Sequence, residues 1–327
     1  MKICYFSCST IYGGVEKIVV DTLNEISKYN DCCLVVPKGC LYKEKLSSSV
    51  KIYEYNSYDK RYNIFLYLEL FKIFKNYDIV HSHAAKASQI TYILSKFLSF
   101  IHIATKHNIR KGKIFNKIKN VISVSAEVAK TITHLSKTLY FGLPLINLEK
   151  QQQDIFTITA IGRLDPIKGF DSLINEVSKL NFDFRLNIIG DGKQKEILEK
   201  LIVSKNLQNR VFLLGFKDNI IQYLKNSDLQ VISSLSEGLP ITLIEGLLYC
   251  PIIISTPVGG ITEVIHKDFL VEIDNFSQKI NDICLNYDDT VKNFALKHDA
   301  MKEKFRFDTY ESELISYYKG CLDAKAL

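Results

Sequence analysis

Short runs rich in β-branched and aromatic residues alternate with amphipathic segments in the first half of the chain. The apolar runs are KICYFSC, DCCLVVP, KIYEYN, YDIVHSH, FIHIATKH, NVISVS and TLYFG. Segments 15–28 and 86–98 lie between some of these runs and have the apolar spacing of helices. Strands that alternate with helices are typical of βαβ units, whose strands form a parallel sheet. The first half therefore predicts an α/β domain.

The same alternation resumes after the polar segment LPLINLEKQQQD, residues 143–154. Five more strands are predicted from IFTITAIGR, DFRLNIIGDG, RVFLLG, DLQVISS and PIIIST. Over 307–324, apolar and aromatic residues recur at helical spacing and predict a last helix. We therefore predict two Rossmann-like parallel-sheet domains that face one another across a ligand-binding cleft. The predicted parts are an N-terminal domain at 1–143, a linker at 144–154, a C-terminal domain at 155–306 and the last helix at 307–327.

Length and composition agree with this organisation, because 327 residues exceed what a single core usually supports. With 47% apolar and 24% charged residues, the chain belongs with globular proteins rather than disordered ones. Its 8 cysteines include no C-x-x-C pair, which favours free thiols in a reducing compartment over a disulfide framework or a metal site. No apolar stretch has the length of a spanning helix. We expect a cytoplasmic protein.

A basic segment at 106–120, KHNIRKGKIFNKIKN, combines lysines and an arginine with isoleucine and phenylalanine and contains no acidic residue. This pattern suits anionic lipid head groups or an anionic acceptor. A solvated basic helix face is an equally good interpretation. No nucleic-acid-binding motif accompanies the segment, so nucleic acid is not an expected partner.

The stretch SEGLPITLIEG holds two glutamates, Glu237 in a predicted loop and Glu245 on the helix that follows. Pro240 suits the first position of that helix, because a residue there needs no N–H donor. Glu245 then lies about 7.5 Å further along the helix axis. The helix N-terminus between the two carboxylates can bind phosphate. The spacing indicates a diphosphate ligand with hydroxyl groups at both ends, although each glutamate alone could simply be structural or solvated.

A second loop, in AIGRLDPIKGFDSLI, carries Arg163 and Lys168 directly after a predicted strand. Two cations at that edge of the sheet can neutralise a diphosphate without a metal ion. No Asp-x-Asp pair is placed to hold Mg²⁺, so we expect neither metal nor cofactor. A basic surface loop is the alternative interpretation.

Glycine turns and histidines follow several of the other predicted strands. Gly13 and Gly14 open a helix after the first strand and allow close approach of a bound group, although a tight turn without a ligand explains them equally well. The G-x-G-x-x-G spacing of dinucleotide-binding enzymes is missing. His81, His83 and His107 end strands, and His107 is the best candidate for contact with a sugar or phosphate.

In this order, GGVE, GRLDPIKG, GDG, EGLPITLIE and TPVGG resemble the retaining glycosyltransferases of family 4, which have the GT-B fold. The resemblance covers nearly the whole chain. It implies that Arg163 and Lys168 bind the donor diphosphate, that Glu237 contacts the donor sugar and that Glu245 binds the ribose. The residues implied to surround the distal phosphate are Gly238, Leu239, Ile241 and Thr242.

The resemblance also implies that His107 lies beside the transferred sugar and that Gly13 and Gly14 approach the donor phosphates and the acceptor. It implies a metal-independent reaction that retains the anomeric configuration. Two features depart from or refine the family pattern: YFGLP at 140–144 replaces an asparagine-glycine turn, and Glu-Gly-Leu-Pro resembles members that use UDP-sugars.

The sequence therefore predicts a glycosyltransferase that moves a hexose or N-acetylhexosamine from a nucleotide diphosphate sugar to a hydroxyl group. The expected acceptor is a cell-envelope or lipid-linked glycan, reached from the cytoplasmic face of the membrane through the basic segment. Two alternatives are a nucleotide-sugar epimerase or hydrolase of the same fold, and a catalytically silent partner subunit.

Overall fold

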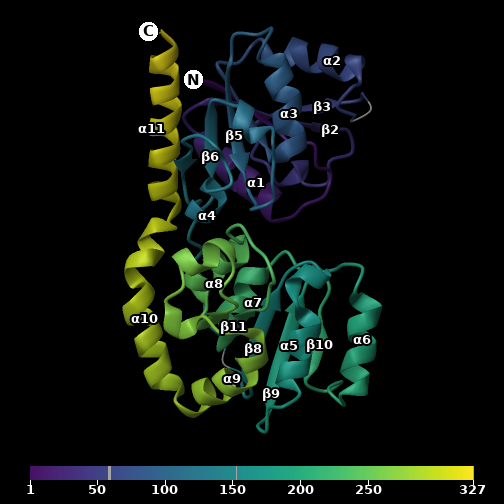
Figure 1. The fold of residues 1–327 in the computed structure, drawn as a ribbon, viewed down its shortest axis with the longest axis vertical. Helices are drawn as coiled ribbons and strands as arrows, with labels where there is room; N and C mark the ends of the chain where they lie inside the picture. Colours follow the sequence, from purple (N-terminus) through teal and green to yellow (C-terminus); the bar gives the residue numbers. More distant parts are fainter. Residues whose placement is uncertain (58–59, 152, 327) are drawn as a thin grey trace. The chain divides into compact units, whose positions relative to one another are not determined.

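The computed structural model describes residues 1–57, 60–151 and 153–326. The chain forms two compact units, one made of Met1–Pro144 together with Phe305–Leu327 and the other of Leu145–Lys304. Each unit contains its own sheet with helices around it (Figure 1). The prediction of two parallel-sheet α/β domains is therefore confirmed.

The first unit contains a parallel sheet in the order β3-β2-β1-β4-β5-β6-β7. Its strands are β1 (Lys2–Phe6), β2 (Asp31–Pro37), β3 (Lys51–Tyr55), β4 (Ile79–His83), β5 (Ile101–Lys106), β6 (Asn120–Ser123) and β7 (Lys137–Thr138). Central strands β1, β4 and β5 are buried along nearly their whole length, which explains their continuous apolar runs. The order reverses between β1 and β4, where parallel sheets usually bind ligands at the carboxyl ends of their strands.

Helices and short 3₁₀ turns connect these strands. They are α1 (Gly14–Ile26), η1 (Lys43–Lys45), α2 (Ile64–Phe74), α3 (Ala84–Leu94), η2 (Phe115–Lys117) and α4 (Ala126–Ala129). The apolar faces of α2 and α3 pack with β1, β2 and β4 in one core cluster that includes Phe6, Leu70 and Ile90. The amphipathic pattern of these segments is therefore explained by burial of one face.

The predicted strand at 138–142 is wrong in length, because β7 ends at Thr138. The Leu139 amide still donates to the Ser123 carbonyl at 3.0 Å, but the chain then leaves the sheet. At Leu143 the amide donates instead to the Phe305 carbonyl, at 2.9 Å. Phe141 is buried without belonging to a strand, so its apolar character reflects packing rather than sheet formation.

The last helix, α11 (Phe307–Ala326), belongs to the first unit. Its residues Tyr310, Leu314 and Tyr318 are buried, as expected for one apolar stripe along a helix. The Tyr318 hydroxyl lies 2.8 Å from that of Tyr5 in β1, and the Thr22 hydroxyl donates to Tyr310 at 3.3 Å. The C-terminal residues therefore complete a core that the N-terminal residues begin.

The second unit contains a parallel sheet in the order β10-β9-β8-β11-β12. Its strands are β8 (Phe156–Ile161), β9 (Phe184–Ile189), β10 (Val211–Leu213), β11 (Leu229–Ile232) and β12 (Ile253–Ser255). Its helices are α5 (Phe170–Val177), α6 (Lys195–Ser204), α7 (Ile220–Asn226), α8 (Ile241–Tyr249), α9 (Phe276–Leu285) and α10 (Tyr287–Lys304). Four 3₁₀ turns complete it: η3 (Pro166–Lys168), η4 (Gly259–Glu263), η5 (Lys267–Phe269) and η6 (Ile273–Asn275).

From Leu145 on, the segment predicted as a linker is part of the second unit rather than a separate connection. The Ile146 amide donates to the Tyr249 hydroxyl at 2.7 Å, and the Gln151 amide donates to the Asn226 side chain at 2.9 Å. At the other end, the second unit stops at Lys304, so Phe305 and Arg306 join the first unit rather than the predicted C-terminal domain.

Candidate functional site

Four loops that carry motifs of the family resemblance lie at the carboxyl ends of strands in the second sheet, and two of them hold predicted site residues. They follow β8, β9, β11 and β12, and they contain GRLDPIKG, GDG, SSLSEGLP and TPVGG. The strand order of this sheet reverses between β8 and β11, because β9 and β10 lie on one side of β8 and β11 and β12 on the other. Loops at such a reversal diverge and leave room for a ligand.

The loops after β8 and β11 are joined by an ion pair between Lys168 and Glu237. The Lys168 Nζ lies 2.5 Å from Glu237 Oε1, and both side chains are mostly buried, with exposed fractions of 17% and 12%. The Ser234 hydroxyl donates to the same carboxylate oxygen at 2.7 Å. The Ser233 hydroxyl donates to the Lys168 carbonyl, also at 2.7 Å. Two residues that the sequence assigned to one ligand therefore lie in direct contact.

Two glycines allow these loops to pack closely against each other. Gly169 has a φ of +63°, and a Cβ there would lie 2.3 Å from the Ser233 carbonyl oxygen. Gly259 has a φ of +52°, and a Cβ there would lie 1.9 Å from the Glu237 carbonyl oxygen. Any larger residue would force these backbones apart. The geometry around Lys168 and Glu237 therefore depends on both glycines.

Arg163 lies in the loop after β8, and its side chain is exposed. Its backbone is fixed by its neighbours: the Asp165 amide donates to the Arg163 carbonyl at 2.8 Å, and the Leu164 amide donates to the Asp191 carbonyl at 2.9 Å. This last bond ties the loop to the GDG turn after β9. The guanidinium group thus extends from a rigid base and can meet an anionic ligand.

The helix N-terminus in the predicted site starts one residue later than expected. Helix α8 begins at Ile241, and Pro240 is its N-cap with an extended ψ of 135° rather than its first residue. Proline can take this position because its fixed φ is also compatible with extended backbone. Leu239 and Ile241 are buried, whereas Thr242 is half-buried. The Gly260 amide donates to the Gly238 carbonyl at 2.7 Å, which anchors the turn before the helix.

Glu245 lies on α8 and is completely buried. Contact between this carboxylate and a ribose would require neighbouring side chains to move. Next to it, a Cβ on Gly246 would overlap the Gln230 side chain at 1.5 Å, so glycine allows α8 to lie close to β11. The Gln230 amide group donates to the Thr242 carbonyl at 2.8 Å.

In the first unit, His107 follows β5 and contacts a row of stacked rings. Its Nε2 lies 3.1 Å from Nδ1 of His83, the last residue of β4. The centroids of the His83 and His81 rings are 4.5 Å apart, and His81 Nδ1 lies 2.5 Å from the Tyr318 hydroxyl on α11. Because Nε2 of His107 faces His83, its Nδ1 is the ring nitrogen that can meet a ligand.

Burial controls the protonation of these histidines. It lowers the pKa of His107 to about 4 and that of His81 to about 3, and it places the pKa of His83 well below the usual value. An isolated charge in such surroundings would be costly, so the neutral form is favoured. At neutral pH the three rings therefore act as hydrogen-bonding groups without charge.

Gly13 and Gly14 lie at the start of α1, directly after β1. Gly13 is the extended N-cap with a φ of −147°, and as a glycine it has no side chain to cap the helix. A Cβ on Gly13 would lie 3.2 Å from Glu16 Oε2, and burial raises the pKa of Glu16. The Glu16 carboxylate hydrogen-bonds to the backbone amides of Gly13 and Glu16, so an anion would have to displace this side chain to reach them.

The basic segment 106–120 is not uniformly exposed. Lys106 is buried, bonds to the Thr131 hydroxyl and lies over the Phe115 ring, with Nζ 5.8 Å from its centroid. Burial lowers its pKa. Lys111 and Lys113 are exposed. The segment is therefore part core and part basic surface.

Sequence reasoning did not identify Ser234 or Gly259 as parts of the site. Ser234 lies three residues before Glu237, in a serine-rich stretch at the end of a strand. Its position directly after the strand is the sequence feature from which its role could have been predicted. Gly259 was quoted only within TPVGG, and its contact with the Glu237 backbone follows from the neighbouring positions of β11 and β12.

The described residues include neither a metal-binding cluster nor a membrane-spanning helix. Within residues 1–57, 60–151 and 153–326, no three His, Cys, Asp or Glu side chains form a group able to hold a metal ion. Among the helices of that same part of the chain, none has the length and apolar character needed to cross a membrane.

Known glycosyltransferases are similar to this chain in sequence. Residues 147–304 match the family described as glycosyl transferases group 1. An uncharacterized glycosyltransferase of Methanocaldococcus jannaschii is 27% identical over 92% of this chain and 93% of its own. The N-acetylgalactosamine-N,N'-diacetylbacillosaminyl-diphospho-undecaprenol 4-alpha-N-acetylgalactosaminyltransferase of Campylobacter jejuni is 31% identical over 52% of this chain and 49% of its own.

Solved structures agree with the fold. Anabaena HepE in complex with UDP-glucose superposes with a TM-score of 0.86 at 20% identity, covering 98% of this chain and 100% of that one. A glycosyltransferase of Rickettsia africae gives a TM-score of 0.78 at 22% identity, with 98% of each chain covered. Residues 147–304 belong to the group 1 glycosyl transferase family, and the relative that matches over 92% of the chain agrees with a glycosyltransferase, whose fold is GT-B.

Proposed function

We propose that the protein transfers a hexose or N-acetylhexosamine from a UDP-linked donor to a hydroxyl group of a glycan. The observation that carries the proposal is the ion pair of Lys168 and Glu237 at the strand reversal of the second sheet. A cation there can bind a diphosphate, and the carboxylate beside it can accept hydrogen bonds from sugar hydroxyls. Structures of HepE with UDP and with UDP-glucose support a uridine donor.

In this reaction the bond between the anomeric carbon and the diphosphate oxygen breaks, and the acceptor oxygen bonds to that carbon with retained configuration. The acceptor proton passes to the departing diphosphate. Lys168, exposed Arg163 and the first amides of α8 stabilise the charge that develops on this group. Three such donors can do this without a metal ion.

We assign the other site residues as the family resemblance implies. Glu237 holds the donor sugar, while Glu245 binds the ribose after a local rearrangement that exposes it. Gly13 and Gly14 approach the donor phosphates through backbone N–H groups. His107 contacts the transferred sugar through Nδ1, because its Nε2 is engaged by His83.

The acceptor that we propose is a lipid-linked or cell-envelope glycan. The Campylobacter jejuni relative is named for a diphospho-undecaprenol substrate. A Saccharomyces cerevisiae relative, 34% identical over 37% of this chain, is named as a phosphatidylinositol N-acetylglucosaminyltransferase subunit. The exposed lysines of the basic segment 106–120 suit a membrane face rich in anionic lipid.

The donor assignment is tested by thermal unfolding with UDP, GDP and UDP-sugars, together with the initial rate of UDP release. UDP present at about 100 times its Kd should stabilise the folded protein by about 2.7 kcal/mol, and GDP should stabilise it less. Lys168→Ala should remove most of this stabilisation. Arg163→Ala and Glu237→Ala should lower the rate by about 100-fold.

The matched control is Lys205→Ala, which removes an exposed lysine of the same unit at the end of α6. It should leave both UDP binding and the rate of UDP release unchanged. Near-normal rates in Arg163→Ala and Glu237→Ala would contradict the site. A larger stabilisation by GDP than by UDP would contradict the uridine donor.

A further inference from the structure

A groove of about 960 Å³ lies within the first unit, away from the residues assigned to the donor and the transferred sugar. Its floor includes His102, Asn120 and Lys137, which lie at the amino ends of β5, β6 and β7. His107 follows the opposite end of β5, about 16 Å away at the usual rise of an extended strand. The volume is within the range of small-molecule sites. The groove is therefore large enough for a ligand and separate from the carboxyl edge of the sheet.

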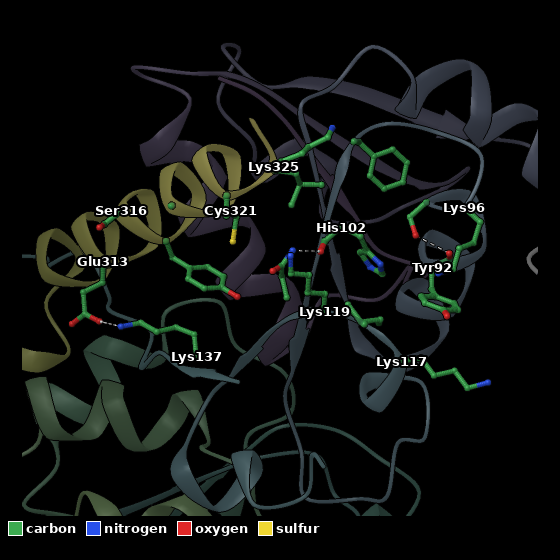
Figure 2. A pocket seen from close by; sticks show the side chains of 18 of the residues that line it. Tyr92, Lys96, His102, Lys117, Lys119, Lys137, Glu313, Ser316, Cys321 and Lys325 are labelled. Carbon is green, nitrogen blue, oxygen red and sulfur yellow. Dashed lines mark hydrogen bonds and ion pairs between the residues drawn. The ribbon is translucent and has the colours of Figure 1, made fainter. Parts of the chain in front are cut away.

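Helix α11 forms one wall of the groove and α3 contributes to the other. Figure 2 shows Ser316, Cys321 and Lys325 on the side of α11, and Tyr92 and Lys96 across from them. The walls thus come from segments far apart in the sequence. A ligand in the groove would contact both the C-terminal helix and the sheet.

The charged groups of the groove are strongly unbalanced. Five of its lining residues are lysines and one is a glutamate: Lys96, Lys117, Lys119, Lys137, Lys325 and Glu313. The Lys137 Nζ lies 3.2 Å from the Glu313 carboxylate, so the single acid is already paired. In the described part of the chain, Lys117, Lys119 and Lys325 make no ion pair. Mutual repulsion of these ammonium groups would be relieved by a bound anion.

His102 gives a second, independent indication of a ligand. Only 8% of this residue is exposed, and it belongs to the floor of the groove. Its Nε2 lies 2.8 Å from the Ser82 hydroxyl, which donates to Ser88 at 3.0 Å, and Ser88 donates to the Ala84 carbonyl at 2.8 Å. Because each serine proton is used in this chain, the histidine proton lies on Nε2.

The other ring nitrogen of His102 is then an acceptor. Nδ1 is buried and has no hydrogen-bond partner within the described residues. An unsatisfied buried acceptor destabilises the protein. Nδ1 is closed to a water-sized molecule in this structure, so a ligand hydroxyl would reach it, and remove that cost, through a small rotation of the ring. The groove therefore combines cations for an anionic group with an acceptor for a hydroxyl group.

We propose that this groove binds a phosphate ester that also carries a free hydroxyl group, at a site distinct from the donor site. Lys119 and Lys325 contact the phosphate, one from each side. The hydroxyl group donates a hydrogen bond to His102 Nδ1. Such a ligand can be a soluble polyol phosphate or the head group of an anionic phospholipid. Phe97, which follows Lys96 and is 74% exposed, is placed to enter a membrane if the phosphate belongs to a lipid.

The test is titration of the full chain with sn-glycerol 3-phosphate, followed by calorimetry, with and without saturating UDP. The double variant Lys119→Ala with Lys325→Ala should weaken binding by about tenfold or more. The control is Lys200→Ala with Lys205→Ala, which removes the same charge from exposed lysines in and directly after α6, in the other unit, and should leave the Kd unchanged. Saturating UDP should not displace the ligand.

Vesicles distinguish the two sources of the phosphate. If it belongs to a lipid, vesicles of phosphatidylglycerol but not phosphatidylcholine should bind, and Phe97→Ala should weaken only the vesicle binding. Binding of glycerol phosphate without vesicle binding assigns the groove to a soluble ester. The proposal is overturned if wild-type protein binds neither probe, if both double variants lose binding equally, or if UDP displaces the ester. Loss of UDP binding alone would contradict the donor site and leave the groove proposal standing.

Discussion

At the residue scale, Lys168 and Glu237 keep each other in position before a donor binds. The pair is mostly buried, and Ser234 donates to the same carboxylate oxygen. A lysine held this way loses less side-chain freedom on binding a diphosphate than a lysine extended into water would. In the proposed site, the other carboxylate oxygen of Glu237 would accept a hydrogen bond from a sugar hydroxyl. The ion pair therefore prepares both groups for one ligand.

The buried histidines of the first unit predict a loss of stability in mild acid. Burial lowers the pKa of His81 and His102 to about 3 and that of His83 well below its usual value. The unfolded chain binds protons as pH falls below about 6.5, while the folded chain does not. The stabilisation is therefore complete above pH 6.5 and is lost progressively toward pH 3. As the pH falls from 7 to 5.5, each buried histidine should lower the free energy of unfolding by about 1 kcal/mol.

Denaturant unfolding at a series of pH values measures this effect. His81→Phe should reduce the slope of stability against pH, because one titrating group is removed, even though loss of the bonds to Tyr318 and Thr105 lowers stability at pH 7. His134→Gln, at a partly exposed position, serves as the control and should retain the slope. Stability that stays constant from pH 7 to 5.5 would contradict the assignment of neutral, buried rings.

At the scale of elements, the crossing between 140–144 and the start of α11 depends on one glycine. A Cβ on Gly142 would lie 2.2 Å from the Arg306 carbonyl oxygen, and Leu143 forms an isolated parallel bridge with Arg306. Gly142→Ala should therefore separate the two segments and destabilise the first unit by about 1–3 kcal/mol. Urea unfolding checks this value. The control Gly320→Ala adds a methyl group on α11 where nothing lies within 4 Å, and it should be neutral or slightly stabilising.

Most elements could be predicted from the sequence because their burial repeats with a clear period. Central strands such as β4 and β5 are buried along their whole length, and α1 buries one face of its side chains. The end of β7 could not be predicted, because Phe141 and Leu143 are buried by packing at the crossing and not by a sheet. An apolar residue indicates that its side chain is buried. The length of a strand also depends on whether a neighbouring strand or another segment packs against it.

The candidate site could be predicted in its residue types but not in its contacts. Lys168 and Glu237 were identified from loops that follow strands, yet 69 residues separate them, and their pairing depends on β8 lying beside β11. The complete burial of Glu245 likewise depends on side chains from outside its own helix. The local sequence places Glu245 on a helix. Only the packed structure shows which side chains surround it.

At the scale of the whole molecule, the two units differ in whether they are formed by one continuous segment of the chain or by two. The second unit is one continuous segment, Leu145–Lys304, whereas the first requires both ends of the chain. A fragment of residues 145–304 should therefore fold alone and retain UDP binding, because it holds its own core and the Lys168–Glu237 pair. Residues 1–144 alone should not fold cooperatively, since Tyr5 and Thr22 lose their partners on α11.

Circular dichroism and thermal unfolding of both fragments, with and without UDP, check this expectation. A cooperative transition raised by UDP in residues 145–304, and no cooperative transition in residues 1–144, would agree with it. An unfolded 145–304 fragment would show that the second unit depends on the rest of the chain.

Because the first unit is formed by two distant segments of the chain, the two units should complete their folding at different times during protein synthesis. The hydroxyl of Tyr5 meets that of Tyr318, 313 residues later in the chain. At typical elongation rates of roughly 5–20 residues per second, Tyr5 leaves the ribosome about 15–60 s before its partner is made. The second unit can complete its core within that interval. The first unit to begin synthesis is thus the last to finish folding, and its exposed apolar surface is the part of the nascent chain that chaperones would meet.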